Sequence, residues 1–445
     1  MILDMTQEDP GKVLRKFTVP MIFSVIFQQM YNMTDSLIVG RYVGYSALAA
    51  VGASYPVTMI FLAVATGINI GSGVVVSKLF GSKMMERMKT AATTALISAI
   101  MTSGVLTFFG LIFSRNMLMR LATPPLIMEQ AKEYLNIYLY GLLFLFLYNI
   151  CTGIFSALGD SKTPLYFLMF SSIGNILMDI YFVVHLKMGV AGVAWATFLC
   201  QGIASLLALF TLMTRLKKIK TKVYPIFSKT MFYSISRMAV PSILQQSFIS
   251  VGNLFIQGLV NSFGAEVMAS YSATIKVNTI ALTSFATVSH AMSGFTAQNM
   301  GSGQIQRVER GFYEGIKLVL KISIPLALIY FVFGKSIIGF FLKSEENTSV
   351  ILKEGVLFLR IISPFYVISC LKLVSDGLLR GAGDINAFMF STFVDLILRV
   401  ILAHIFVYIF RWGSLGIWLA WPWGWFIGTG ISLYLYKKGA WKHIV

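Results

Sequence analysis

Charged residues are scarce in this sequence. They make up 12% of the chain, whereas soluble domains carry roughly a quarter. Hydrophobic residues, in contrast, make up 57%. A chain of this composition has too little polar surface to face water on all sides, so we expect lipid to be its solvent. The shortage of charge therefore excludes an ordinary soluble domain.

Cysteine and histidine are also rare. Cys151, Cys200 and Cys370 lie far apart within apolar runs, and the four histidines are scattered along the chain. Neither residue type shows the spacing of a disulfide framework or a metal site. An enzyme would need a nucleophile–base pair or a metal set. We therefore expect no enzyme activity, no bound metal and no cofactor.

Acidic residues are half as numerous as basic ones, 18 against 36, which leaves a formal net charge of +18. A nucleic-acid-binding domain would gather its basic residues on one polar face. Here they lie in short gaps between apolar runs of about 20 residues, the length that spans a bilayer. The expected partner of this charge is the lipid bilayer rather than a nucleic acid.

The apolar runs predict twelve membrane-spanning helices. The predicted ranges are 17–40, 54–78, 90–113, 132–155, 163–186, 190–214, 232–262, 267–299, 312–334, 354–376, 385–410 and 414–436. Lys and Arg favour alternate gaps by roughly two to one, which predicts a multi-pass cell-membrane protein with both termini in the cytoplasm. The basic stretch 215–229 is predicted to be a solvated loop that touches lipid headgroups.

The two halves of the chain repeat one design. "ALGDSKTP" (157–164) and "GAGDINAF" (381–388) lie 224 residues apart, as do "GVAGVAWA" (189–196) and "GSLGIWLA" (413–420). We predict an all-α integral membrane protein with two six-helix bundles related by a pseudo-two-fold axis along the membrane normal. The predicted organisation is a first lobe (1–214), a basic linker (215–237) and a second lobe (238–445). Each Gly-Asp pair is interpreted as a tight turn.

Polar residues in the first half are predicted to meet within the membrane. Asp35 lies on the first span, Asn175 and Asp179 lie one turn apart on the fifth, and Thr197 lies on the sixth. Their oxygens suit a proton or a small cation. Alternatively, each acid could have a purely structural role and form a hydrogen bond to a neighbouring helix. Because the polar set occurs only once in a duplicated fold, a functional role is favoured. The equivalent residues of the second half are Phe255, Arg399, Ala403 and Trp421.

Other polar residues lie near this set. Gln28 and Tyr31 share the side of the first span that carries Asp35, and Asn149 is a similar intramembrane amide. They could line a substrate cleft or form hydrogen bonds between helices. Both interpretations stay open.

Five stretches together resemble the multidrug and toxic compound extrusion (MATE) transporters over nearly the whole chain. These are "QQMYNMTDSLIVGRYVGYSALAAVG", "YNICTGIFSALGDSKTPLYF", "GVAGVAWAT", "FTAQNMGSGQIQRV" and "LLRGAGD". The resemblance implies a secondary antiporter, expected as a monomer, that exports cationic or amphiphilic drug-like compounds as H⁺ or Na⁺ enters. Asp35, Asn175, Asp179 and Thr197 match the coupling residues of its proton-linked branch. A bend of the first helix near Pro20 is also implied.

The second half departs from the sodium-linked branch of that family, which places acids on the seventh and tenth helices. Glu266 lies past the end of the seventh span, and Asp376 lies near the cytoplasmic end of the tenth. This argues against an ion site in the second lobe but leaves the choice between H⁺ and Na⁺ open. Lys276 and the i,i+4 pair Asp395/Arg399 are intramembrane charges, and we interpret that pair as a structural ion pair.

Three other functions were weighed against an alternating-access antiporter. A lipid-linked oligosaccharide flippase would carry an anionic cargo and need several basic residues in its cleft, where we expect Lys276 and Arg399 alone. An intramembrane enzyme would need histidines at catalytic spacing. A channel would need a filter sequence, which a duplicated two-lobe chain with glycine-rich hinges does not show.

Overall fold

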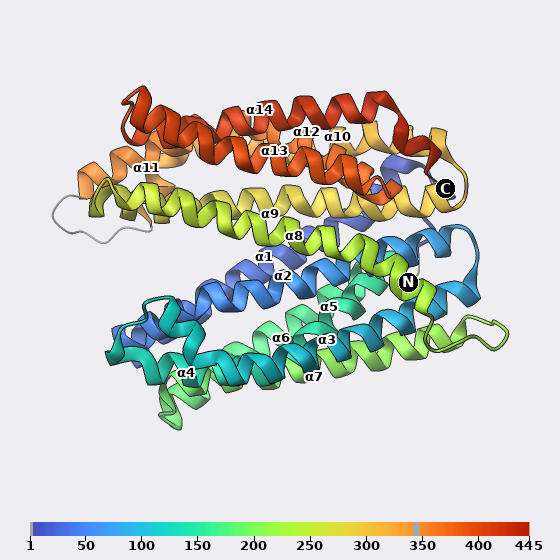
Figure 1. The fold of residues 1–445 in the computed structure, drawn as a ribbon, viewed down its shortest axis with the longest axis horizontal. Helices are drawn as coiled ribbons and strands as arrows, with labels where there is room; N and C mark the ends of the chain where they lie inside the picture. Colours follow the sequence, from blue (N-terminus) through green and yellow to red (C-terminus); the bar gives the residue numbers. More distant parts are fainter. Residues whose placement is uncertain (1–2, 341–347, 445) are drawn as a thin grey trace. The chain divides into compact units, whose positions relative to one another are not determined.

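The computed structural model describes residues 3–340 and 348–444, and the side chains of residues 33, 35–37, 40, 45, 46, 48 and 348 lie outside that description. Throughout the described part, helices joined by short turns make up the chain, without a strand. Figure 1 follows these helices in sequence order, from the blue N-terminus to the red C-terminus.

The helices of the first half end at short polar or glycine-containing turns. They are α1 (Pro10–Ile38), the π turn η1 (Val39–Val43), α2 (Tyr45–Gly81), α3 (Met85–Arg120), α4 (Pro125–Tyr140), α5 (Leu142–Ala157), α6 (Lys162–Ile180), the π turn η2 (Tyr181–His185) and α7 (Gly189–Lys218).

The second half repeats this order. It contains α8 (Lys229–Asn261), α9 (Ala265–Gly301), α10 (Ile305–Gly339), α11 (Thr348–Ile362), the 3₁₀ turn η3 (Ser363–Phe365), α12 (Tyr366–Ala382), α13 (Ile385–His404), the π turn η4 (Ile405–Ile409), α14 (Ser414–Lys438) and the 3₁₀ turn η5 (Ala440–His443).

These helices cover each of the twelve predicted spans. Eight segments within the described residues are long and apolar enough to cross a membrane, and α4 with α5 forms a ninth that bends by 47°. The break falls at Gly141, whose amide bonds to the carbonyls of Ile137 and Tyr138. The many exposed apolar side chains along these spans, such as Phe108 (62%) and Leu177 (63%), are expected of a surface solvated by lipid.

The repeat predicted from the sequence is visible in the packing. In the first half α2 packs on α3, α4 and α5, and α7 packs on α5 and α6. In the second half α9 packs in the same way on α10, α11 and α12, and α14 packs on α12 and α13, as Figure 1 shows for α13 and α14. The correspondence extends to the π turns η2 and η4, which begin 224 residues apart. One supersecondary plan is therefore used twice.

Both Gly-Asp pairs form the predicted turns. Gly159 and Gly383 have φ angles of 77° and 91°, a left-handed conformation that glycine adopts without strain. The Asp160 carboxylate accepts from the Thr163 amide at 3.1 Å, and the Asp384 carboxylate accepts from the Ala387 amide at 3.1 Å. Asp384 is the N-cap residue of α13, and Asp160 binds the first turn of α6 from the residue before its N-cap.

Contacts divide the chain into two compact units. Of the described residues, unit 1 contains 3–4 and 19–243, and unit 2 contains 5–18, 244–340 and 348–444. The divisions fall inside α1 and α8, close to Pro20 and Pro241, and the second lies beyond the predicted linker. The early residues belong to unit 2 because the Met5 amide donates to Gln298 Oε1 at 3.0 Å, and Arg307 donates to the Met5 carbonyl at 3.1 Å.

The basic stretch 215–229 is bound to unit 1 at its start. Arg215 forms an ion pair with Asp160, and the buried Lys89 ammonium donates to the Ile219 carbonyl at 2.6 Å and to Thr221 Oγ1 at 2.9 Å. The prediction of a wholly solvated loop is therefore wrong for these residues. Carbonyls at the end of α7 attract the lysine of α3 because they lack partners within the helix.

Candidate functional site

Three of the four predicted coupling residues lie in contact within unit 1. Asn175 and Asp179 project from the same face of α6 and are 2% and 0% exposed. In one amide orientation, the Asn175 nitrogen donates to Asp179 Oδ2 at 2.9 Å. Its oxygen then accepts from the Thr197 amide at 3.1 Å and from Thr197 Oγ1 at 3.3 Å. The packing of α6 on α7 thus brings a buried amide and carboxylate against a half-buried hydroxyl.

Tyr31 joins this set from α1. Its hydroxyl lies 3.4 Å from Thr197 Oγ1, which links α1 to α7 within unit 1. Asp35 lies one helical turn further along α1, on the side that carries Tyr31. The side chain of Asp35 lies outside the described residues, so its meeting with the other three stays a prediction.

The other predicted residues have different surroundings. Gln28 is exposed on α1. Asn149 is half-buried and donates to the Leu145 carbonyl of its own helix at 2.8 Å. α1 continues as a helix through Pro20, so the bend implied for this position stays a prediction. The structure therefore joins Tyr31 to the set but gives neither Gln28 nor Asn149 a contact with it.

The set lies close to one end of unit 1. Asp179 is the penultimate residue of α6, and Thr197 lies about two turns into α7. An apolar cluster covers this end, formed by Ile38, Val39, Ala47, Val183, Val190 and Val193. Apolar side chains of this kind shield that end of the bundle from water.

A small cavity of about 20 Å³ borders Thr197. It is bordered by Tyr134 and Tyr138 of α4 and by Thr197 and Gln201 of α7. This volume is enough for about one water molecule. We did not predict Tyr134, Tyr138 or Gln201 from the sequence, although the i,i+4 spacing of Gln201 from Thr197 places both on one face of α7.

Within the described residues, no group of three or more His, Cys, Asp or Glu side chains comes together. Asp179 instead accepts from the Asn175 amide, whose oxygen contacts the Thr197 hydroxyl. Hard oxygen donors of this kind suit a proton or a hard cation such as Na⁺, and they do not suit the softer metals that prefer nitrogen and sulfur.

The equivalent region of unit 2 has a different polarity. Arg399, the counterpart of Asn175, is 6% exposed and donates to Asn253 Oδ1 at 3.3 Å. Its guanidinium carbon lies 4.2 Å from the ring centroid of Trp421, the counterpart of Thr197. A cationic group thus occupies the position that an amide occupies in unit 1.

The predicted ion pair of Asp395 with Arg399 is wrong. Asp395 Oδ2 instead lies 3.6 Å from the Lys372 ammonium, which also bonds to Asp376 Oδ2 at 2.7 Å. Lys372 reaches across from α12 because Gly428 on α14 leaves room, since a Cβ there would lie 2.8 Å from Lys372 Cε. Lys276, the other charge noted in this half, is exposed on α9.

Asp376 connects three helices of unit 2. Its Oδ1 accepts from Ser391 Oγ of α13 and Ser432 Oγ of α14, each at 2.7 Å, while its Oδ2 binds Lys372. All four groups are buried. Each carboxylate oxygen therefore has partners within the unit, which is the arrangement of a satisfied structural ion pair.

Known proteins resemble this chain along its length. The model of the MatE family matches residues 20–181 and again residues 241–405, one match in each half. A probable multidrug resistance protein, YpnP of Bacillus subtilis (strain 168), is 29% identical over 99% of this chain and 97% of its own length. The probable multidrug resistance protein NorM of Thermotoga maritima is 24% identical over 97% of this chain and 93% of its own length.

A solved structure of a multidrug resistance MATE family transporter of the MOP superfamily has the same fold. Its TM-score is 0.92 at 22% identity, and the match covers 98% of this chain and 97% of that one. The all-α, two-bundle prediction is confirmed, and the flippase alternative is not favoured by these relatives. The chain therefore belongs to the MatE family and is a membrane transporter rather than an enzyme.

Proposed function

We propose that the chain is a secondary antiporter that exports cationic or amphiphilic organic compounds in exchange for H⁺ or Na⁺. The observation that carries this proposal is the contact of the buried Asn175 and Asp179 with the half-buried Thr197. A carboxylate in a membrane interior costs several kcal/mol unless it is protonated or paired. Each such acid is therefore a candidate for ion coupling.

The Asn175 amide connects the carboxylate of Asp179 with Thr197. When Asp179 is ionised, the amide nitrogen faces its Oδ2 at 2.9 Å, and the amide oxygen faces Thr197. When Asp179 takes up a proton, its Oδ2 becomes a weaker acceptor for the amide nitrogen, whereas a turned amide would set that nitrogen against the Thr197 backbone N–H at 3.1 Å, donor against donor. The amide thus links a change of charge on α6 to the hydrogen bonding of α7.

Tyr31 carries this change to α1. Its hydroxyl meets Thr197 Oγ1 at 3.4 Å, so whether Thr197 donates or accepts decides which group Tyr31 can bond. In the proposed cycle, uptake of the cation at Asp35 and Asp179 alters α1 near Pro20 and weakens the hold on the substrate. When the cation leaves, Asp35 and Asp179 return to the ionised state, and the affinity for the substrate is restored. Coupling requires that substrate and cation bind the two states unequally.

Three finer points belong to the same proposal. Both termini are placed in the cytoplasm by the distribution of Lys and Arg. The transporter acts as a monomer, and each half supplies one bundle. Gln28 and Asn149 contribute to the substrate cleft rather than to the ion site.

The proposal is tested with cells that depend on drug efflux for growth. Asp35→Asn and Asp179→Asn should both abolish resistance at unchanged membrane expression, and Thr197→Ala should weaken it. Ser205→Ala is the matched control, because this buried hydroxyl of α7 bonds to the Gly202 carbonyl of its own helix at 2.8 Å. Full resistance in the Asp179→Asn variant would refute the proposed role of that acid.

A further inference from the structure

The basic stretch 215–229 is held along the start of α3 over much of its length. The Lys222 amide donates to Glu86 Oε1 at 3.2 Å, and the Ser228 amide donates to Thr94 Oγ1 at 3.1 Å. Both acceptors lie in about the first three turns of α3. Figure 1 shows the stretch as the yellow-green loop that joins α7 to α8. These contacts fix its position along the axis of α3.

The contacts with α3 place this stretch at the depth of the lipid headgroups. The predicted span of α3 begins at residue 90, so Glu86 lies about 6 Å outside the span and Thr94 lies about 6 Å inside it. The headgroup layer of one leaflet is about 5–7 Å thick. Because Lys222 is bound at the first of these levels and Ser228 at the second, the backbone between them crosses this layer.

The lysines of this stretch form a cluster of positive charge. The stretch contains no acidic residue, and each of its lysines is exposed. These are Lys217, Lys218, Lys220, Lys222 and Lys229. Clusters of about four to eight basic residues beside a membrane-spanning helix bind anionic lipid surfaces. The charge of the cluster is therefore complementary to an anionic headgroup.

Apolar side chains lie among these lysines and are also exposed. Val223, Ile226 and Phe227 are 99%, 68% and 41% exposed, although none of them belongs to a helix. The apolar surface continues on the flanking spans, through the exposed Phe210 of α7 and Tyr233 of α8. Basic and apolar side chains together are typical of segments that lie in the interface of a membrane. Lipid therefore accounts for both kinds of exposed side chain.

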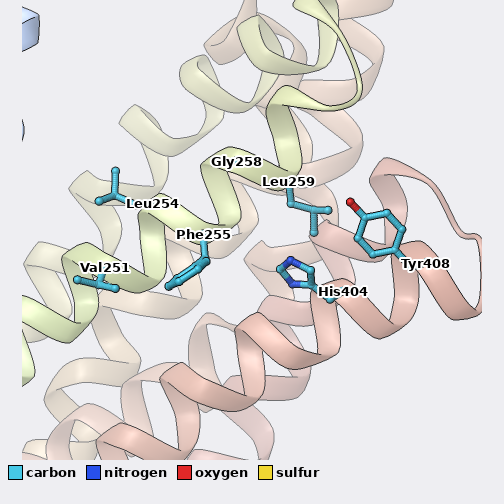
Figure 2. Close-up of a pocket in the computed structure, with 7 residues that line it drawn as sticks. All are labelled: Val251, Leu254, Phe255, Gly258, Leu259, His404 and Tyr408. Carbon is cyan, nitrogen blue, oxygen red and sulfur yellow. The ribbon is translucent and has the colours of Figure 1, made fainter. Parts of the chain in front are cut away.

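A groove between α8 and the segment formed by α13 and η4 has a different character. It has a volume of about 470 Å³, and Figure 2 shows Val251, Leu254 and Phe255 on its α8 side with His404 and Tyr408 opposite. None of its lining residues, all of which the structure describes, is a lysine or an arginine. The groove gives an anionic headgroup no cationic partner, so it serves as an internal control.

We propose that the basic stretch 215–229 is a docking surface for anionic phospholipids. Its lysines bind the phosphate groups, and Val223, Ile226 and Phe227 enter the boundary between headgroups and acyl chains. This is more than contact with headgroups in general, because it requires a negative charge on the lipid and insertion of apolar side chains. The inference goes beyond the proposed transport function and does not depend on what the chain transports.

The test measures lipid contact with the full-length chain in nanodiscs of phosphatidylcholine and phosphatidylglycerol. Val223→Cys is labelled with the fluorophore NBD, since Cys151, Cys200 and Cys370 are buried. Quenching is compared for phosphatidylglycerol and phosphatidylcholine that carry a nitroxide near the headgroup. We expect the anionic lipid to quench about fivefold more effectively at equal mole fraction, as contact with one lysine predicts. High salt should reduce this preference.

Matched variants separate charge from position. The fourfold variant K217Q/K218Q/K220Q/K222Q should lose the preference but remain quenched by both lipids, because the apolar side chains still insert. The same four positions changed to arginine should retain the preference. Lys222 contacts Glu86 through its backbone amide, so substitution of its side chain leaves that contact in place. NBD on Leu254→Cys, in the groove, should be quenched equally by the two lipids.

Three results would overturn the proposal. The first is equal quenching of the Val223→Cys label by both lipids at low salt, and the second is a preference that survives in the fourfold glutamine variant. The third is loss of the preference when inorganic phosphate is added at constant ionic strength, which would identify a site for free phosphate. A Val223→Cys label that neither lipid quenches would likewise show that the stretch lies in water.

Discussion

Replacing Lys372 by methionine should destabilise unit 2 more than any other single loss of charge. Its ammonium is the counter-ion of both Asp376, at 2.7 Å, and Asp395, at 3.6 Å, and the Lys372 and Asp376 side chains are each 5% exposed. Removing one partner of a buried ion pair leaves an uncompensated charge, which costs about 3–5 kcal/mol. Asp376→Asn should cost less, about 1–3 kcal/mol, because Lys372 keeps Asp395.

The free energy of unfolding can be measured by titration with a denaturing detergent in mixed micelles. Lys276→Met is the control, since it removes an exposed lysine of the same unit and should change stability by at most about 0.5 kcal/mol. The double variant Lys372→Met/Asp376→Asn should recover part of the loss. Equal stabilities for Lys372→Met and Lys276→Met would show that the contacts of Lys372 with Asp376 and Asp395 add no net stability to unit 2.

Two further predictions concern local packing and can be checked by the same titration. Asp160→Ala should cost about 2 kcal/mol, because it loses both a helix cap and the ion pair with Arg215. Asp384→Ala should cost about 1 kcal/mol, because within the described residues its carboxylate forms the helix cap but no ion pair, and equal losses would contradict this reasoning. Gly428→Val should cost about 1–3 kcal/mol by pressing on the Lys372 stem at 2.8 Å, whereas a neutral effect would mean that the stem moves freely.

The spans and turns could be predicted from the sequence because their signals are local. A run of about 20 apolar residues sets a helix length in lipid, and a Gly-Asp pair supplies both a left-handed residue and a cap. The contact of Asn175, Asp179 and Thr197 could also be anticipated, because α6 and α7 are consecutive helices. The number of residues from the start of each helix, at 1.5 Å of rise per residue, then gives the depth of a side chain in the membrane.

Contacts between distant parts of the chain could not be read in this way. Residues 5–18 belong to unit 2 because Arg307 and Gln298 bind the Met5 backbone, and no periodic pattern reports such a pairing. Asp395 was predicted to pair with Arg399 because an i,i+4 spacing is visible in a sequence. The Lys372 side chain, which reaches Asp395 from another helix through the space left by Gly428, has no such signature.

The most direct test of ion coupling at Asp179 is efflux of a fluorescent organic cation from proteoliposomes, with a pH gradient and a Na⁺ gradient imposed separately. We expect one of the two gradients to drive transport in the wild-type chain and neither to do so in Asp179→Asn, with Ser205→Ala behaving as wild type. Efflux that responds to neither gradient, or that persists at full rate in Asp179→Asn, would contradict ion coupling at Asp179.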